Sequence, residues 1–240
     1  MIDENKETES KEIHYTFQFP DGITKEFSVK LDFNTLSLIH TAKETYPDWT
    51  KLEYCQCPNC PLSTEDHLRC PIALNLSDLI DSFSDSISYE NVSVSIVTDA
   101  RAYHLDTTLQ RVLSSLIGIY MVTSDCPIMD KLRPMVDSHL PFATSEETTY
   151  RMITMYLMAQ YFRNKHGKDP DWELNHFVDL MREISSVDIA FSKRLRSIQI
   201  KDASLNAITI LHTYGQSASF SIEEQDLSRM ESIFMKHYGD

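Results

Sequence analysis

The spacing of apolar residues changes near Thr107, and this change constrains the fold more than any other feature. Before it, four segments alternate polar and apolar positions, as strands with one buried face do. After it, apolar residues recur at helical spacing almost to the end of the chain. We therefore predict an α+β protein, with an α+β part in residues 13–106 and a helical bundle in residues 107–240. The alternating segments are "IHYTFQF" and "TKEFSVKLDF", joined through "PDGI", and then "NVSVSIVT" and "ARAYHL".

The α+β part should also contain two helices. The segment "NTLSLIHTAKETYPDW", residues 34–49, has helical spacing of its apolar residues and should end at Pro47. The second helix is expected in "PIALNLSDLIDSFSDS", residues 71–86, directly after Cys70. Between them, "KLEYC" is expected to form a short strand that leads into a cysteine-rich loop.

Helix signals dominate the second part. Thr144 and Glu147 have capping-box spacing, and the helix that they open is apolar nearly all round, so we expect it in the middle of the bundle. Asp169, followed by Pro170, should begin the next helix, with Trp172 and residues 177–184 on its buried face. The other expected helical segments are 108–122, 127–140 with a bend at Pro134, about 187–214, and 222–238.

Charge and composition exclude several functional classes. With 36 acidic against 22 basic residues, the net charge of −14 argues against a general nucleic-acid-binding protein. The longest apolar run, Leu116 to Val122, is too short to span a membrane. Residues 1–12 are acidic and polar, so we expect a disordered tail without a secretory signal, and a cytoplasmic protein. The five glycines lie too far apart to form a phosphate-binding loop.

Four of the five cysteines lie within sixteen residues, in the pattern Cys55-x-Cys57-x2-Cys60-x9-Cys70. Proline follows Cys57, Cys60, Cys70 and, later, Cys126. A cysteine that precedes a helix beginning with proline has its sulfur beside unpaired N–H groups, which stabilise a thiolate. We therefore predict that Cys57, Cys60, Cys70 and Cys126 form a metal site, and that Cys126 ties the two parts of the chain together. The reserve ligands are Cys55 and His67.

Zinc is the expected metal, because four thiolates are typical of structural zinc sites. The alternative is a 4Fe–4S cluster, since cysteine followed by proline also occurs at iron–sulfur ligands, and Pro61 stands where a zinc knuckle usually has glycine. The cysteines could instead be small buried hydrophobic residues. Cys126 could also be a catalytic nucleophile, with His139 as base and Asp125 or Asp130 nearby.

A basic run on the acidic chain has two interpretations. We expect it to be a solvated helix face, and the second interpretation is a docking site for an acidic partner or for another copy of the chain. The run consists of Lys193, Arg194, Arg196 and Lys201.

Four motifs, "CPNCPL", "CPIMDKLRPM", "HLPFATSEETTYR" and "MYLMAQYFR", resemble those of an uncharacterised bacterial family, a domain of unknown function. The resemblance runs from about Ile13 to Tyr214. It implies a bacterial cytosolic origin and carries no activity.

From these features we expect a non-enzymatic, cytoplasmic metal-binding protein that serves regulation or protein–protein contact, with a protein partner or self-association. The alternatives are an iron–sulfur redox sensor or electron carrier and a thiol enzyme that uses Cys126.

Overall fold

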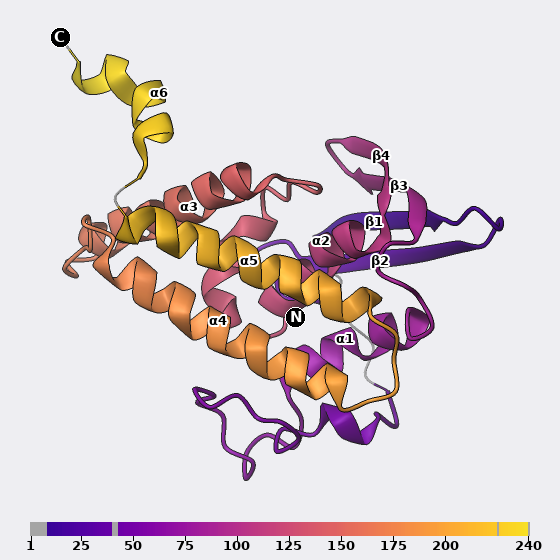
Figure 1. Ribbon diagram of the computed structural model, residues 1–240. Helices are drawn as coiled ribbons and strands as arrows, with labels where there is room; N and C mark the ends of the chain where they lie inside the picture. The colour runs from indigo at the N-terminus through magenta and orange to yellow at the C-terminus, as the bar shows by residue number, and fades with distance from the viewer. Residues whose placement is uncertain (1–8, 40–42, 225, 240) are drawn as a thin grey trace, which may run out of the picture.

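The computed structural model describes residues 9–39, 43–224 and 226–239, and it combines an antiparallel sheet with a group of long helices (Figure 1). The sheet has four strands in the order β2-β1-β3-β4, so the two hairpins pair through β1 and β3. This arrangement confirms the α+β class. The strands are β1 (Ser10–Gln18), β2 (Thr24–Asp32), β3 (Asn91–Thr98) and β4 (Ala102–Thr108).

The predicted hairpins are both present, because their alternation matches one buried face. In β1, Ile13, Tyr15 and Phe17 are fully buried, while the residues between them face outward. Gly22 closes the first turn with φ +88°, a left-handed conformation that glycine adopts without strain. β1 already begins at Ser10, so the expected tail of residues 1–12 is too long by three residues. Residues 1–8 of that tail lie outside the described part of the chain.

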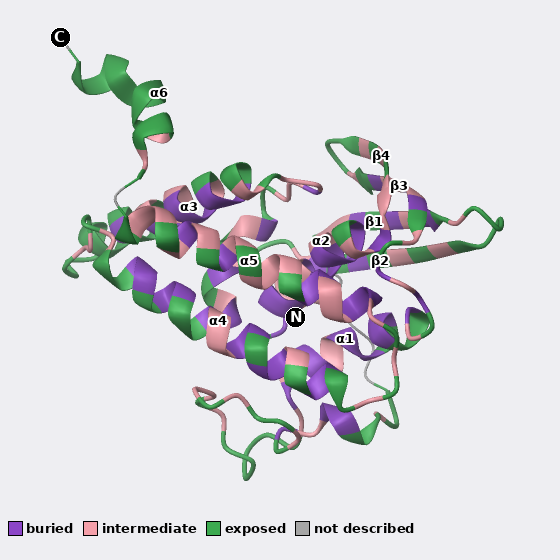
Figure 2. Cartoon of the chain, in the orientation of Figure 1, coloured by how far each residue is buried: buried purple, intermediate pink, exposed green. Residues whose placement is uncertain are grey.

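The helical part is organised around α5, which packs against α2, α3 and α4. Figure 2 shows α6 extending from the end of α5 with no buried residue. No helix of the described residues is long and apolar enough to cross a membrane. The helices are α1 (Pro71–Ser82), α2 (Leu109–Val122), α3 (Ser145–Lys165), α4 (Asn175–Arg196), α5 (Ala203–Glu223) and α6 (Ser228–Tyr238), with the 3₁₀ helices η1 (Asp48–Thr50) and η2 (Met129–Val136).

The expected helix over residues 34–49 is wrong in its described portion. The Asp32 carboxylate accepts the N–H groups of Asn34 and Thr35, and this turn competes with helix formation. Leu36 then adopts φ +56°, and Ile39 N–H donates to the Lys30 carbonyl at 2.8 Å, beside the edge of the sheet. Residues 40–42 lie outside the described residues.

The capping box of Thr144 and Glu147 is confirmed, but α3 does not run through the middle of the bundle. That place belongs to α5, and the C-terminal half of α3 leaves apolar side chains exposed. Met158, Tyr161 and Phe162 are each about half exposed. The helix α3 is therefore apolar nearly all round because apolar side chains lie on its exposed face as well as on its buried face.

The start of α4 also differs from the prediction. Asp169 caps no helix, and α4 begins at Asn175, where the Asp171 carboxylate accepts the N–H groups of Asn175 and His176. Trp172 is 49% exposed and does not belong to the buried face. The remaining residues predicted for that face are buried: Phe177, Leu180, Met181 and Ile184.

Two further helical segments are shorter than expected. The segment 187–214 is divided by a loop at residues 197–202 between α4 and α5. The segment 127–140 forms only the 3₁₀ helix η2, with Pro134 inside it. The expected strand "KLEYC" is reduced to a single bridge between Lys51 and Arg69.

Candidate metal centre

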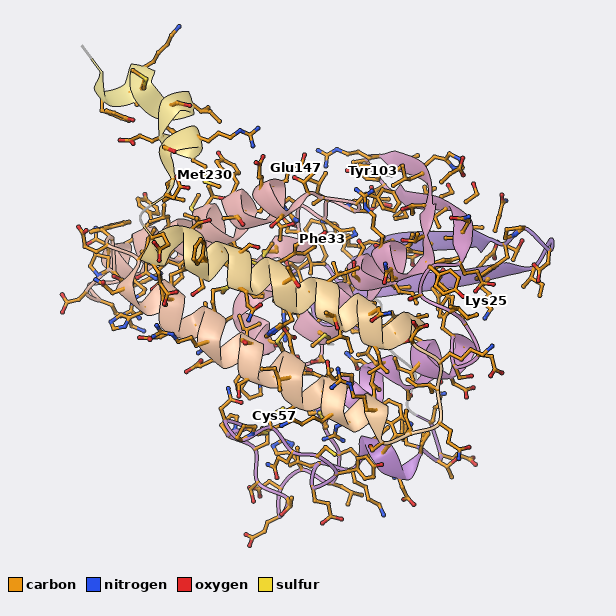
Figure 3. All side chains as sticks on the ribbon, viewed as in Figure 1. Lys25, Phe33, Cys57, Tyr103, Glu147 and Met230 are labelled. Carbon is orange, nitrogen blue, oxygen red and sulfur yellow. The ribbon has the colours of Figure 1, made fainter. Side chains whose placement is uncertain are left out.

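The cysteine loop occupies residues 51–69, between η1 and α1, and backbone contacts join its two ends. Leu52 N–H donates to the Leu68 carbonyl at 3.0 Å, and Cys70 N–H donates to the Thr50 carbonyl at 2.8 Å. In Figure 3, Cys57 lies on this loop next to α4. These backbone hydrogen bonds therefore fix the two ends of the loop against each other.

Cys57 and Cys60 share a tight turn, as their spacing predicts. Cys60 N–H donates to the Cys57 carbonyl at 3.0 Å, and both side chains are half-buried. Between them, the Asn59 side-chain amide donates to the Glu183 carbonyl of α4 at 2.9 Å. The turn is thus held against α4 with its two thiols on the inner side of the loop, packed against the core.

Cys70 is the N-cap residue of α1, with Pro71 at the first helical position, as predicted. Its side chain is buried, which raises the pKa of the thiol, and the backbone N–H groups of Ile72 and Ala73 act in the opposite direction. The Cys70 side chain forms no cap hydrogen bond with the backbone of α1. The sulfur nevertheless lies where the start of α1 favours a thiolate.

Cys126 has the same environment at the start of a different helical segment. Its carbonyl accepts Asp130 N–H at 2.9 Å, and the N–H groups of Ile128 and Met129 lower the pKa of its thiol, against the larger effect of burial. The regular part of the segment, η2, begins at Met129 and not directly after the cysteine. The helix expected at Cys126 is therefore a turn followed by a 3₁₀ helix.

The four predicted cysteines lie in one neighbourhood. Burial, together with the charges of Cys70, Cys60 and Cys126, raises the pKa of Cys57 to about 12. Charge on Cys60 also raises the pKa of Cys70 and of Cys126. Within the described residues, however, no three His, Cys, Asp or Glu side chains are close enough together to hold a metal ion. The fold therefore gathers these thiols without setting them at ligand distances from a common point.

The reserve ligands stand apart from this group. Cys55 is exposed, with φ +50°, and His67 is exposed on the outer part of the loop. Neither contributes to the pKa shifts of the other cysteines. The choice of Cys57, Cys60, Cys70 and Cys126 as the ligands stays a prediction.

Arg194 completes the neighbourhood and corrects the interpretation of the basic run. It is 1% exposed and donates to the carbonyls of Trp49, Lys51 and Leu52 at 2.6, 2.7 and 3.3 Å. Its charge lowers the pKa of Cys57 and Cys70, and it forms no salt bridge with any described carboxylate. Arg194 is thus a buried cation whose charge acts on Cys57 and Cys70.

The apolar spacing in the sequence indicates that Arg194 is buried, although the basic run around it suggests an exposed position. Arg194 follows Phe191 by three residues and Val187 by seven, and both of these are buried in α4. Helical spacing therefore places the arginine on the buried face. The exposed members of the run are Lys193, Arg196 and Lys201.

The arrangement required for a Cys126 nucleophile with a His139 base is not formed. His139 Nε2 lies 2.7 Å from the Tyr15 hydroxyl and 3.4 Å from that of Ser115. Asp125 and Asp130 both pair with Arg133. These side chains therefore belong to other networks.

Comparison with protein families matches residues 13–235 to one family model, described as "Domain of unknown function (DUF6901)". The match covers nearly the whole chain and confirms the predicted membership of an uncharacterised family. No curated protein and no solved structure matches the chain.

Proposed function

The chain belongs to the DUF6901 family, whose function is unknown, and we propose that its cysteine centre binds one metal ion. The ligands are Cys57, Cys60, Cys70 and Cys126 as thiolates, and zinc is the metal that four thiolates favour. The bound ion serves a non-enzymatic role in regulation or protein–protein contact.

The observation that carries this proposal is the buried charge of Arg194. Burying a guanidinium is costly unless its N–H groups are hydrogen-bonded and its charge is also offset by an anion. Three carbonyls accept hydrogen bonds from its Nη1 and Nη2 groups, but no described carboxylate neutralises its charge. Four thiolates around Zn²⁺ carry a net charge of −2, and Arg194 together with the N–H groups at Cys70 and Cys126 would offset that charge.

Metal binding on this proposal includes a local rearrangement. The four thiols are not arranged as a metal site, and burial raises the pKa of Cys57, Cys70 and Cys126, which favours their protonated forms in the absence of metal. Binding would displace their protons and draw the 57–60 turn toward Cys70 and Cys126, so affinity should rise with pH. Among the described residues, one side-chain hydrogen bond, from Asn59, joins this turn to α4, and its two cysteines are only half-buried, whereas Cys70 and Cys126 are buried. We therefore expect the turn to be the part that moves.

A closed site would join segments that are far apart in the sequence. Cys57 and Cys60 belong to the loop, Cys70 begins α1, and Cys126 lies between α2 and η2. The ion would therefore tie residues 13–106 to residues 107–240. No side-chain base hydrogen-bonds any of the four thiols in the described part of the chain, which favours a structural ion over thiol catalysis.

An iron–sulfur cluster is the second candidate, favoured by the N–H groups that approach the sulfurs of Cys70 and Cys126. Such groups stabilise an anionic cluster and tune its potential. The cluster would serve as a redox sensor or electron carrier.

Metal and sulfide analysis of anaerobically purified protein separates the candidates. We expect a colourless protein with about one zinc per chain, and a chelator should lower its melting temperature because site formation and folding are coupled. A brown protein with iron and labile sulfide would replace zinc with a cluster. Protein that contains neither metal, and does not bind zinc when it is added, would refute both.

A further inference from the structure

A cavity of about 130 Å³ lies between α2, the chain around η2, the first turns of α3 and α5, and no cysteine lines it. Its volume is close to that of an engineered apolar cavity of ~150 Å³ that binds benzene in another protein. It can therefore hold an apolar group of roughly six to eight carbon atoms. Most of its wall is apolar and includes Ile119, Val122, Leu132, Met135, Met152 and Leu211.

Two arginines also line this cavity, and neither forms a salt bridge with a described carboxylate. Arg111 of α2 donates to the Phe142 carbonyl at 3.1 Å. Arg151 of α3 donates to the carbonyls of Met135 and Ser138 at 2.7 and 3.0 Å. Burial lowers the pKa of Arg151, so its charge would gain from an anion. The chain has a net charge of −14, yet no described carboxylate pairs with these two guanidiniums. They are therefore available to bind the carboxylate of a ligand.

No side chain that lines the cavity carries a negative charge. The Glu147 carboxylate, which lines the adjoining hollow, acts on Arg151 by its charge but forms no salt bridge with it. His139 Nε2 is tied to the Tyr15 hydroxyl, and burial together with the charges of Arg151 and Lys11 lowers the pKa of His139 to about 3. The imidazole is therefore neutral at physiological pH. Ser115 joins the same network, so neither side chain supplies a negative charge.

Arg151 stands at the connection between the cavity and solvent. Together with Leu140, it also lines a larger hollow of about 690 Å³ between α3, the end of α5 and α6. A ligand could thus enter from that hollow with its apolar end first and keep its charged end at Arg151.

We propose that this cavity binds a small monocarboxylic acid with an apolar body, such as an aromatic acid or an aliphatic acid of about six carbons. The apolar body fills the cavity, and the carboxylate pairs with Arg151, with Arg111 at the rim. A guanidinium fork matches the geometry of a carboxylate better than that of a neutral hydroxyl group.

The test is a titration of protein labelled with ¹³C at its methionine methyl groups. The probes are benzoate, benzyl alcohol as its neutral analogue and acetate as an anion without an apolar body. We expect benzoate to shift the signals of Met135 and Met152, which line the cavity, with saturation. The exposed Met158 and Met235 should not respond. Benzyl alcohol and acetate should bind at least about tenfold more weakly.

Variants test the role of each part of the site. Arg151→Met should weaken benzoate binding at least about tenfold, whereas Arg101→Met, on the exposed β3–β4 turn, should leave it unchanged. Because Arg151 also supports two carbonyls, Ala143→Leu provides a second variant, which fills the cavity and retains both arginines. It should abolish binding in a folded protein. Equal affinity for benzyl alcohol, shifts spread over all methionines, or undiminished binding by either folded variant would overturn the proposal.

Discussion

Arg194→Met is the substitution that most directly perturbs the surroundings of the cysteines. Methionine can occupy much of the same buried space but donates no hydrogen bonds. The carbonyls of Trp49 and Leu52 would lose their donor, whereas the Lys51 carbonyl would still accept the N–H of Tyr54 at 3.2 Å. The substitution therefore leaves two backbone acceptors unpaired next to the cysteine loop.

The expected loss of stability follows from those two acceptors. A buried polar group left without its partner costs about 1–3 kcal/mol, so the variant should lose about 2–6 kcal/mol of unfolding free energy. With metal bound, loss of the charge beside the thiolates should add about 0.5–3 kcal/mol, the range found for groups in one network. Arg196→Met is the matched control, because this exposed arginine lies two residues further along α4 and should change stability by less than ~0.5 kcal/mol.

Urea unfolding followed by circular dichroism measures both effects, in metal-loaded protein and after chelation. The penalty of Arg194→Met should be larger in the metal-loaded protein than in the metal-free protein. A penalty no greater than that of Arg196→Met would refute the buried role of Arg194. A penalty that is the same with and without metal would show that its charge does not act on the thiolates.

Three further substitutions test separate features. Cys126→Ser should lose metal and destabilise the fold, whereas Cys55→Ser should keep both, as measured by elemental analysis and thermal melting; equal loss in both would mean that the four ligands are wrongly chosen. Thr144→Ala should cost about 1 kcal/mol in urea unfolding through loss of the α3 cap, whereas an effect equal to that of the neighbouring Ser145→Ala would count against the cap. Burial raises the pKa of Asp188 to about 8, so the folded chain keeps a proton that the unfolded chain releases above about pH 4. The stability from this group is full at low pH and is lost as pH rises toward 8, so Asp188→Asn should flatten the decline measured between about pH 5 and 8; an unchanged slope would exclude a neutral buried carboxyl.

The elements that the sequence predicted correctly are those specified by local chemistry. Alternation with a glycine turn defined the first hairpin, and the Thr144–Glu147 pair located the start of α3. Cysteine followed by proline correctly placed Cys70 at the cap of α1. These signals act over a few residues, so the rest of the fold does not override them.

The errors occurred where contacts distant in the sequence decide the outcome. Residues 34–39 have helical apolar spacing, but they follow an Asp32 turn and bind the edge of a sheet that composition does not reveal. Asp169 has a helix-start sequence, yet α4 begins at Asn175, and the Asp171 carboxylate accepts its first N–H groups. Arg194 belongs to a charged run, and only the packing of α4 on the cysteine loop shows that it is buried. The same limit applies to the site, since spacing selected the cysteines but could not fix their separations.

X-ray absorption at the edge of the bound metal measures the ligand set itself. For zinc, we predict four sulfur ligands at about 2.3 Å in the native protein and three in any zinc that remains bound to Cys126→Ser. A first shell made mainly of nitrogen and oxygen, or four sulfur ligands that persist in Cys126→Ser, would contradict a site that joins Cys126 to the cysteine loop.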